Sequence, residues 1–227
     1  MKIAGIQKSS TIDYPGHLSC VLFTPGCNLD CFYCHNRALL EGGAPLLDEA
    51  EVFAFLQKRS GLLDGVVISG GEPTLQSDLK EFIQKLRELN YEIKLDTNGQ
   101  NIPVLAPLLS EGLIDYLAVD IKALPEQYES VCKKDGYENA VSVLRLAMEA
   151  GVACEGRTTV YPGMRPDMLL SLAKQMPRLP RWRLNVYHTP AQYKPEDELR
   201  VRIAALSETE LAHSLPELEI FQPGVCL

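Results

Sequence analysis

Six short runs rich in β-branched and apolar residues alternate with helical segments along this 227-residue chain. The expected strands cover residues 18–24, 65–69, 92–97, 116–121, 153–160 and 183–188. The expected helices cover residues 47–59, 76–89, 102–111, 139–150 and 166–175. Leu79, Phe82 and Ile83 illustrate the helical spacing of the apolar positions, and Asn90 and Gly112 follow helices at positions suited to a stop. Strands that alternate with helices in this way form parallel βαβ units.

The alternation predicts one α/β domain over residues 1–227. Its expected architecture is a partial (β/α)6, TIM-like barrel of parallel strands with outer helices, and an open doubly wound sheet is the alternative. Residues 1–17 form an N-terminal extension and residues 190–227 a C-terminal extension. In either architecture, ligands bind at the carboxyl ends of the strands, so polar residues there are candidate site residues.

Charge and hydropathy exclude several classes of function. The formal charge of −8 argues against a nucleic-acid partner, whose phosphates call for a basic surface. No run of eighteen apolar residues occurs, so we expect no membrane helix. The first residues lack the apolar stretch of a signal peptide, and we therefore expect a cytoplasmic protein.

Three of the seven cysteines lie in one loop, residues 25–36, which follows the first expected strand. Cys27, Cys31 and Cys34 have the spacing C-x3-C-x2-C. Thiolates suit iron–sulfur clusters, zinc or Cu(I). Structural zinc takes four ligands, and His35 directly follows Cys34, where its reach is awkward. An electron-transfer cluster usually has a fourth thiolate, whereas a four-iron cluster held by three thiolates leaves one iron open to a ligand.

The remaining cysteines stand among apolar or helical neighbours, and we expect them to be buried and inert. They are Cys20, Cys132, Cys154 and Cys226.

Polar residues also follow the other expected strands. They are Gly70, Gly71 and Glu72 after the second, Asp96 and Thr97 at the end of the third, Asp120 and Lys122 at the fourth, Arg157 on the fifth and His188 at the sixth. Paired glycines let a ligand approach the backbone, and the carboxylates suit hydroxyls, amines or cations. Tight turns, caps and structural ion pairs are the alternatives for these segments.

The cysteine loop resembles that of radical S-adenosylmethionine (SAM) enzymes, in which the motif is C-x3-C-x-aromatic-C and Tyr33 is here the aromatic residue. The resemblance extends over nearly the whole chain. It implies one [4Fe–4S] cluster on the three cysteines, with SAM chelated at the open iron. It also implies reductive cleavage of SAM to methionine and a 5′-deoxyadenosyl radical, which abstracts a hydrogen atom.

The same resemblance suggests roles for the strand-end residues. Gly70, Gly71 and Glu72 match the segment that binds the SAM amino group. The segments at Asp96 and at Asp120–Lys122 look like those of glycyl-radical-enzyme activases, where they lie near SAM and the substrate peptide. Members of that group bind a monovalent cation, and the resemblance implies that Asp96, Thr97 and Asp120 are its ligands here.

Two further residues are assigned to SAM. The planar guanidinium of Arg157 suits bidentate binding of the SAM carboxylate. His188 matches a terminal Tyr-His near adenine. A structural ion pair and a structural histidine are the alternatives.

Residues 11–16 read Thr-Ile-Asp-Tyr-Pro-Gly, which alone indicates a turn. The pattern resembles activases, and places Asp13 among the catalytic candidates with Lys122 and the cysteines. Its Asp-Tyr-Pro-Gly form looks like that of activating proteins for anaerobic ribonucleoside-triphosphate reductase. Formate-lyase activases usually have Gly and Arg where this chain has Tyr14 and His17.

The sequence therefore predicts a radical SAM activase that removes a hydrogen from a glycine Cα of a partner enzyme. The expected partner is anaerobic ribonucleotide reductase, and a flavodoxin- or ferredoxin-type protein supplies electrons. Alternatives are an activase of another glycyl radical enzyme, a small-molecule enzyme such as a deazapurine synthase, and a non-enzymatic iron–sulfur carrier. Residues 35–64 contain no cysteine, so no second cluster is expected there.

Overall fold

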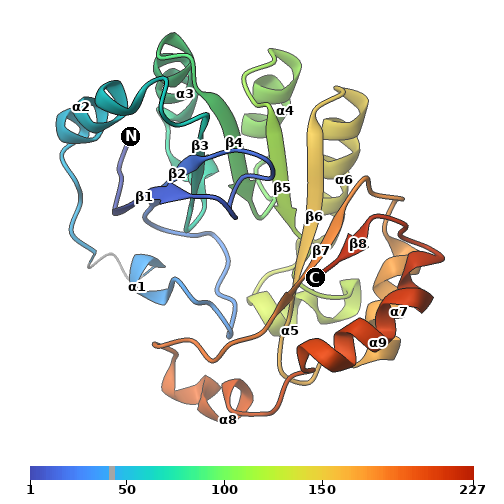
Figure 1. Cartoon of the computed structure of the whole chain (residues 1–227). Helices are drawn as coiled ribbons and strands as arrows, with labels where there is room; N and C mark the ends of the chain where they lie inside the picture. Colours follow the sequence, from blue (N-terminus) through green and yellow to red (C-terminus); the bar gives the residue numbers. More distant parts are fainter. Residues whose placement is uncertain (41–43) are drawn as a thin grey trace.

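The computed structural model describes residues 1–40 and 44–227. Within them, eight strands form one sheet in sequential order (Figure 1). The strands are β1 (Gly5–Ser10), β2 (Ser19–Thr24), β3 (Gly65–Gly70), β4 (Glu92–Thr97), β5 (Tyr116–Asp120), β6 (Ala153–Val160), β7 (Trp182–Val186) and β8 (Val225–Cys226). Strands β2 to β7 are parallel and correspond to the six predicted strands, which confirms the α/β barrel-like fold. β1 lies antiparallel to β2 at one edge, and β8 extends the other edge beside β7.

The helices lie in the connections between the strands. They are α1 (Arg37–Leu40), α2 (Glu49–Arg59), α3 (Leu79–Glu88), α4 (Ile102–Ser110), α5 (Tyr128–Cys132), α6 (Tyr137–Glu149), α7 (Pro166–Gln175), α8 (Glu198–Val201) and α9 (Glu208–Glu219). Short 3₁₀ turns cover Pro73–Leu75, Pro125–Gln127 and Pro195–Asp197. The predicted helix at 76–89 starts later, at Leu79, because the residues after Glu72 first form one of these turns.

Helix α3 shows how the sequence builds the outer layer. Its apolar residues Leu79, Phe82, Ile83 and Leu86 are buried, and they lie three or four positions apart on one face of the helix. Asn90 follows with a φ of 62°, a left-handed conformation that ends the helix. The helix packs on β4, so the outer face of the sheet is covered by apolar residues.

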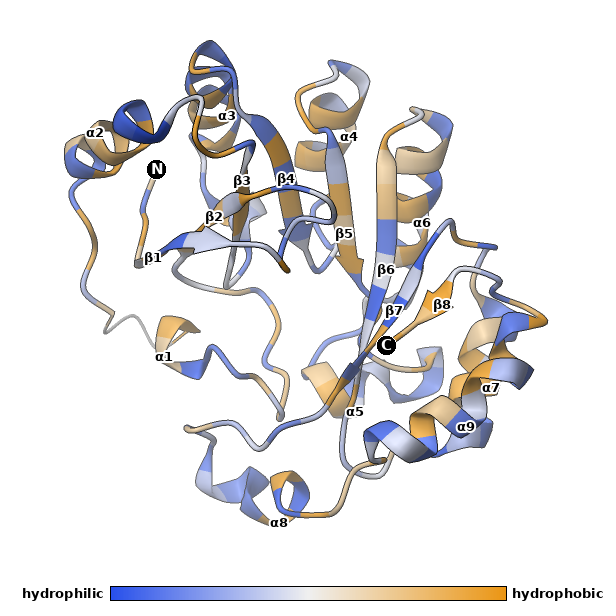
Figure 2. Ribbon diagram, viewed as in Figure 1, coloured by the Kyte–Doolittle hydropathy of each residue, from blue (hydrophilic) through white to orange (hydrophobic). Residues whose placement is uncertain are grey.

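The inner face of the sheet is more polar. Figure 2 shows hydrophilic residues along the lower half of β6 and on β7. Alternate residues of a strand point to opposite faces, so Glu155, Arg157 and Thr159 share the inner face of β6. The two buried residues flanking Arg157, Gly156 and Thr158, face the helices.

One end of the barrel interior is filled by Tyr14, from the turn between β1 and β2. Its side chain is buried and packs with Val21 and Val67, and its ring lies 5.8 Å from that of Tyr116. A Cβ at Gly65 would come within 2.8 Å of the Tyr14 ring, so the absence of a side chain there makes room for the tyrosine. The N-terminal extension is therefore part of the barrel core.

The C-terminal extension returns to the cysteine loop. Lys194 pairs with Asp30 of that loop, and the guanidinium of Arg200 lies 3.9 Å from the centre of the Phe32 ring. Strand β8 lies within this extension and adds a short strand at the edge of the sheet. Among the described residues, no helix is both long enough and apolar enough to cross a membrane.

Candidate functional site

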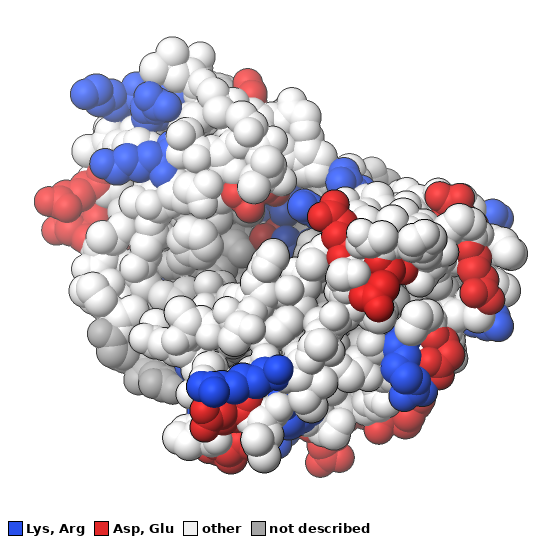
Figure 3. All heavy atoms as spheres, turned by 60° about the horizontal axis from the view of Figure 1, so that its bottom comes forward, with Lys and Arg blue, Asp and Glu red and all other residues white. Residues whose placement is uncertain are grey.

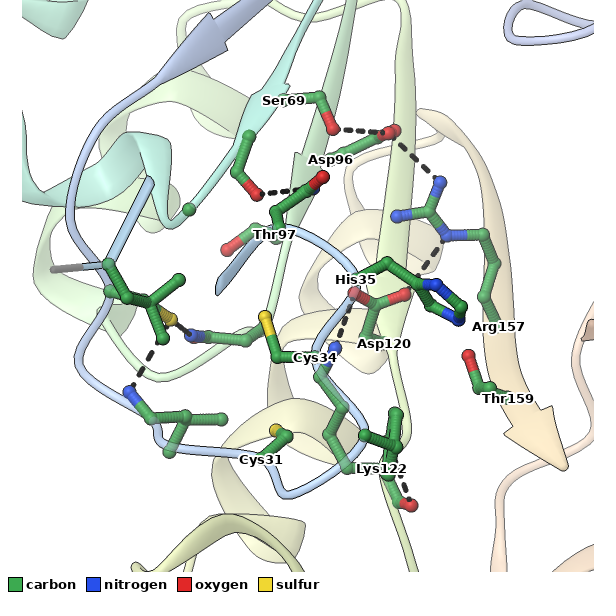
Figure 4. A pocket seen from close by; sticks show the side chains of 18 of the residues that line it. Cys31, Cys34, His35, Ser69, Asp96, Thr97, Asp120, Lys122, Arg157 and Thr159 are labelled. Carbon is green, nitrogen blue, oxygen red and sulfur yellow. Dashed lines mark hydrogen bonds and ion pairs between the residues drawn. The ribbon is translucent and has the colours of Figure 1, made fainter. Parts of the chain in front are cut away.

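A cavity of about 310 Å³ opens at the carboxyl ends of the parallel strands, where the fold predicts a ligand site. Its lining combines the cysteine loop with residues of β3 to β7. Figure 3 shows acidic and basic side chains inside a hollow of this face, and Figure 4 shows the side chains themselves. The lining residues are Asp13, Cys27, Leu29, Cys31, Tyr33, Cys34, His35, Asn36, Leu40, Ser69, Gly70, Gly71, Asp96, Thr97, Asn98, Asp120, Lys122, Arg157, Thr159 and Asn185.

All three loop cysteines line this cavity. The loop is held by its backbone: the amide of Asp30 donates to the carbonyl of Cys132 at 3.0 Å. The buried guanidinium of Arg37 donates to the carbonyl of Cys31 at 2.7 Å and to the Asp30 carboxylate at 2.5 Å. Cys27 also accepts from the backbone amide of Leu29 at 3.4 Å. The three sulfur atoms are therefore presented by a fixed loop beside open space.

The thiols differ in their surroundings. Burial raises the pKa of Cys27 to about 11 and also raises the pKa of Cys34. A hydrogen bond with Cys132, 3.5 Å away, lowers the pKa of Cys31. Metal binding displaces thiol protons, and soft sulfur donors facing an open cavity fit a cluster with one open iron.

The glycine pair at the end of β3, Gly70 and Gly71, lies against the start of the cysteine loop through backbone contacts. The amide of Gly71 donates to the Thr24 carbonyl, and the amide of Glu72 donates to the Gly26 carbonyl, each at 2.8 Å. A Cβ at Gly71 would lie 1.8 Å from the Gly26 oxygen, so no side chain fits there. The absence of a side chain at Gly71 thus allows the end of β3 to approach the cysteine loop closely.

Replacing Gly71 with alanine is expected to displace the cysteine loop and to lower cluster occupancy at least several-fold. The Gly26 carbonyl has to move, because backbone atoms cannot overlap a methyl group. Iron and sulfide analysis after anaerobic reconstitution measures the effect. Gly5→Ala is the control, because its added Cβ meets Phe23 at an ordinary 3.6 Å. Equal iron content in both variants would contradict the role of Gly71.

Glu72 has a different place from the one expected of a ligand residue. Its side chain is fully buried and is not among the residues that line the cavity. The carboxylate accepts from the hydroxyl of Thr97 at 2.8 Å and from the amide of Asn98 at 2.7 Å, and it also accepts from the amide and hydroxyl of Thr74. Burial raises its pKa. Glu72 therefore ties the end of β3 to the end of β4.

A row of alternating charges runs from β4 to β6, and Figure 4 shows the four members that line the cavity, which are Asp96, Arg157, Asp120 and Lys122. The fully buried Lys94 pairs with Asp96, which accepts from Arg157 at 2.9 Å. Arg157 also donates to Asp120 at 3.0 Å, and Asp120 accepts from Lys122 at 2.8 Å. Burial disfavours the Lys122 ammonium, but Asp120 together with the other acidic groups nearby outweighs burial and raises the pKa of Lys122. The row favours the ionised forms of Asp96, Asp120, Lys122 and Arg157.

Asp96 is expected to make the metal-free protein less stable in acid. Burial opposes its ionisation, but Arg157 and Lys94 outweigh burial and hold the pKa of Asp96 at about 2. Because this lies below the unfolded value of about 3.9, the stabilisation is complete above the unfolded pKa and is lost as pH falls through the folded one. We expect about 2 kcal/mol of unfolding free energy to disappear between about pH 4 and pH 2. In urea unfolding, the free energy of unfolding of Asp96→Asn should not fall in this way between about pH 4 and pH 2. An equal fall with pH in both proteins would contradict the role of Asp96.

The expected oxygen ligands of a monovalent cation are already engaged. Asp96 accepts from Ser69 at 3.0 Å as well as from Lys94 and Arg157. Thr97 donates to Glu72 and accepts from the amide of Gly99 at 3.1 Å. The carboxylates of Asp96 and Asp120 are thus paired with ammonium and guanidinium groups, Thr97 is paired with Glu72, and the cation site stays a prediction.

Two other predicted residues differ in placement. Tyr33 lines the cavity and stacks on Tyr161 with ring centres 5.3 Å apart. His188 lies beyond the end of β7 at Val186, is exposed, and is not part of the lining. Strand β7, the sixth of the predicted strands, ends at Val186, two residues before its predicted end, and His188 therefore lies outside the sheet.

Asp13 lines the cavity although it precedes the first parallel strand, and it accepts a hydrogen bond from Ser10 at 2.5 Å. Sequence reasoning did not single out Ser69, Asn98, Thr159 and Asn185, which also line it. The signal for Thr159 and Asn185 was available: each lies two residues beyond an inward-facing arginine on the same strand, and alternate residues share a face.

Comparison with known proteins places this site in a family. Residues 21–176 match the radical SAM superfamily. A Methanocaldococcus jannaschii protein named as a glycyl-radical enzyme activating enzyme is 38% identical over 70% of this chain and 68% of its own length. A Pyrococcus abyssi protein named as a GTP 3′,8-cyclase is 27% identical over 68% of this chain, which spans only 51% of that relative.

The fold has matching solved structures. Streptococcus suis SuiB bound to S-adenosylmethionine aligns with a TM-score of 0.65 at 16% identity, over 86% of this chain and 47% of SuiB. The radical SAM superfamily, which residues 21–176 match, implies a [4Fe–4S] cluster and SAM. The matched residues include the cysteine loop, the glycine pair and the charged row of the cavity floor. This chain is a member of the radical SAM superfamily.

Proposed function

We propose that this chain is a cytoplasmic radical SAM activase that takes a hydrogen atom from a glycine Cα of a partner enzyme. The observation that carries the proposal is the cavity in which the three loop cysteines, the glycine pair and Asp13 meet. The relative named as a glycyl-radical enzyme activating enzyme supports the same assignment. We further propose anaerobic ribonucleoside-triphosphate reductase as the partner, on the Asp-Tyr-Pro-Gly form of residues 13–16.

The cavity offers separate groups to cluster and cofactor. Cys27, Cys31 and Cys34 would hold one [4Fe–4S] cluster, and the backbone at Gly70 and Gly71 would face the SAM amino group. When bound, the cluster supplies the electron for reductive cleavage of SAM to methionine and a 5′-deoxyadenosyl radical. A flavodoxin- or ferredoxin-type protein would provide that electron.

Arg157 is suited to the SAM carboxylate as well as to its own carboxylate partners. Its Nε donates to Asp120 and one Nη donates to Asp96. Within residues 1–40 and 44–227, its other Nη donates to no protein acceptor. A planar guanidinium held on two sides is oriented for a third carboxylate.

The hydrogen transfer balances without a further co-reactant. The glycine Cα–H bond breaks, and the hydrogen atom moves to the 5′ carbon of the deoxyadenosyl radical. The products are 5′-deoxyadenosine and a glycyl radical on the partner. The open mouth of the cavity in Figure 3 leaves room for a segment of another chain to reach the bound SAM.

The experiment has two stages. Anaerobically reconstituted protein with dithionite and SAM should produce 5′-deoxyadenosine, and the absence of this product with or without partner would overturn the radical SAM activity. Addition of anaerobic ribonucleotide reductase should then give the doublet of a glycyl radical in electron paramagnetic resonance (EPR) spectra. A reductase whose radical glycine is replaced by alanine is the matched control.

Parallel reactions separate the partner from the alternatives. Formate-lyase-type enzymes test another glycyl radical partner, while GTP and a deazapurine precursor test small-molecule chemistry. GTP is included because several relatives are named as GTP 3′,8-cyclases, although this chain spans about half their length. Consumption of either small molecule without a protein partner would contradict the activase proposal.

A further inference from the structure

Cys132 touches the cysteine loop from outside the cavity. It is the last residue of α5, its side chain is fully buried, and it is not one of the residues that line the cavity. Its Sγ lies 3.5 Å from the Sγ of Cys31, within hydrogen-bond distance for sulfur. A cysteine 101 positions away in sequence therefore sits against a predicted cluster ligand.

Backbone hydrogen bonds fix this contact on both sides of Cys31. The amide of Asp30 donates to the carbonyl of Cys132 at 3.0 Å, and the amide of Phe32 donates to the carbonyl of Val131 at 3.2 Å. Lys133 follows with a φ of 61°, which ends α5 at this point. The two sulfurs meet because the end of the helix is fastened to the loop.

Binding of iron by Cys31 would decide which of the two sulfurs donates the hydrogen bond and which accepts it. A metal-bound thiolate has no proton, so its sulfur can only accept a hydrogen bond. Cys132 lies outside the expected ligand set, and a thiol that binds no metal carries an S–H that can donate, so the Cys132 thiol is the donor. The reduction potential of an iron–sulfur cluster depends on hydrogen bonds to its sulfurs. A donor withdraws electron density and favours the reduced form.

We propose that Cys132 is a positioning residue whose thiol donates a hydrogen bond to the Cys31 sulfur and raises the reduction potential of the cluster. This inference rests on the cluster assignment within the proposed function and is independent of the partner. It assigns a role to a residue that its apolar surroundings alone indicate to be inert.

The test is an EPR-monitored redox titration of anaerobically reconstituted, full-length protein. Cys132→Ala removes the donor, and Cys132→Val removes it while filling the space. Both are expected to shift the midpoint potential to more negative values. Cys132→Ser keeps an O–H donor and should stay close to the wild-type potential or above it. Cys154→Ala is the control, because this buried cysteine lies on β6 and is not part of the cavity lining.

The outcomes are distinct. Unchanged potentials in the Ala and Val variants would overturn the inference, and so would an equal negative shift in Cys132→Ser, which would indicate packing rather than hydrogen bonding. If one variant does not fold, the others decide. A wild-type protein that binds no cluster would overturn the proposed function as well, whereas a cluster-bearing protein with unchanged potentials would overturn this inference alone.

Discussion

Replacing Cys27 with alanine is expected to abolish cluster assembly, lowering iron from about four atoms per chain to near zero. Cys27 lines the cavity, and among the described residues the groups within hydrogen-bond distance of its sulfur are the side chains of Asn28 and Asn98 and the amide of Leu29. None of these groups is a thiol, so no neighbour replaces the lost ligand. SAM cleavage is expected to disappear with the cluster.

Iron and sulfide analysis and the visible absorption of the reconstituted variant measure this loss. Cys20→Ala is the control, because that cysteine is fully buried in β2 and is not part of the cavity lining. Full iron content in Cys27→Ala would remove it from the ligand set. Near-ultraviolet circular dichroism would confirm that the fold is intact.

Cys31 requires a different design. Its alanine variant leaves the Cys132 thiol 3.5 Å from the original sulfur position, close enough to offer a substitute ligand. We therefore expect the double variant Cys31→Ala, Cys132→Ala to lose any iron that the single variant retains.

Replacing Arg157 with methionine is expected to destabilise the protein by about 3 kcal/mol. The guanidinium separates two partly buried carboxylates, donating to Asp96 at 2.9 Å and to Asp120 at 3.0 Å. Without it, two negative charges on neighbouring strands face each other, and Lys94 and Lys122 neutralise each of them from one side only. Removal of one partner from a buried ion network leaves a charge that is costly to bury.

Urea unfolding at neutral pH measures this change. Arg165→Met is the matched control, because Arg165 pairs with Asp167 on the surface and its loss should leave the stability nearly unchanged. Adding Asp120→Asn to Arg157→Met should recover part of the loss, because it removes one of the facing charges. A loss that is equal in both arginine variants would contradict the buried network.

The sequence alone was sufficient for the parallel strands and for the cluster loop. Strand and helix periodicity is a local property, and it located all six parallel strands to within two residues at each end. The spacing of Cys27, Cys31 and Cys34 is equally local, because one loop carries all three. The strand-end rule then brought Gly70, Asp96 and Asp120 to the same edge of the sheet, where the cavity opens.

Contacts between distant segments were decided by tertiary structure alone. Glu72 has the sequence context of a ligand residue, yet it is buried between the ends of β3 and β4. Its carboxylate accepts hydrogen bonds from Thr97 and Asn98 and so joins the two strand ends. Asp96 and Asp120 suit a cation by composition, and the structure adds that Arg157 of β6 donates to both of them across the sheet. Sequence periodicity predicts which face of a strand a residue occupies, but it does not predict which charged residue of another strand contacts it.

The cysteines show the same division. Sequence spacing by itself determined that three thiols share one loop, and it predicts an open position on a four-iron cluster. Only the fold decided that Cys132, 101 residues beyond Cys31, lies 3.5 Å from it. The physical reason is that ligand spacing is set by a few adjacent backbone dihedrals, whereas the neighbours of a ligand are set by the packing of α5 against the loop.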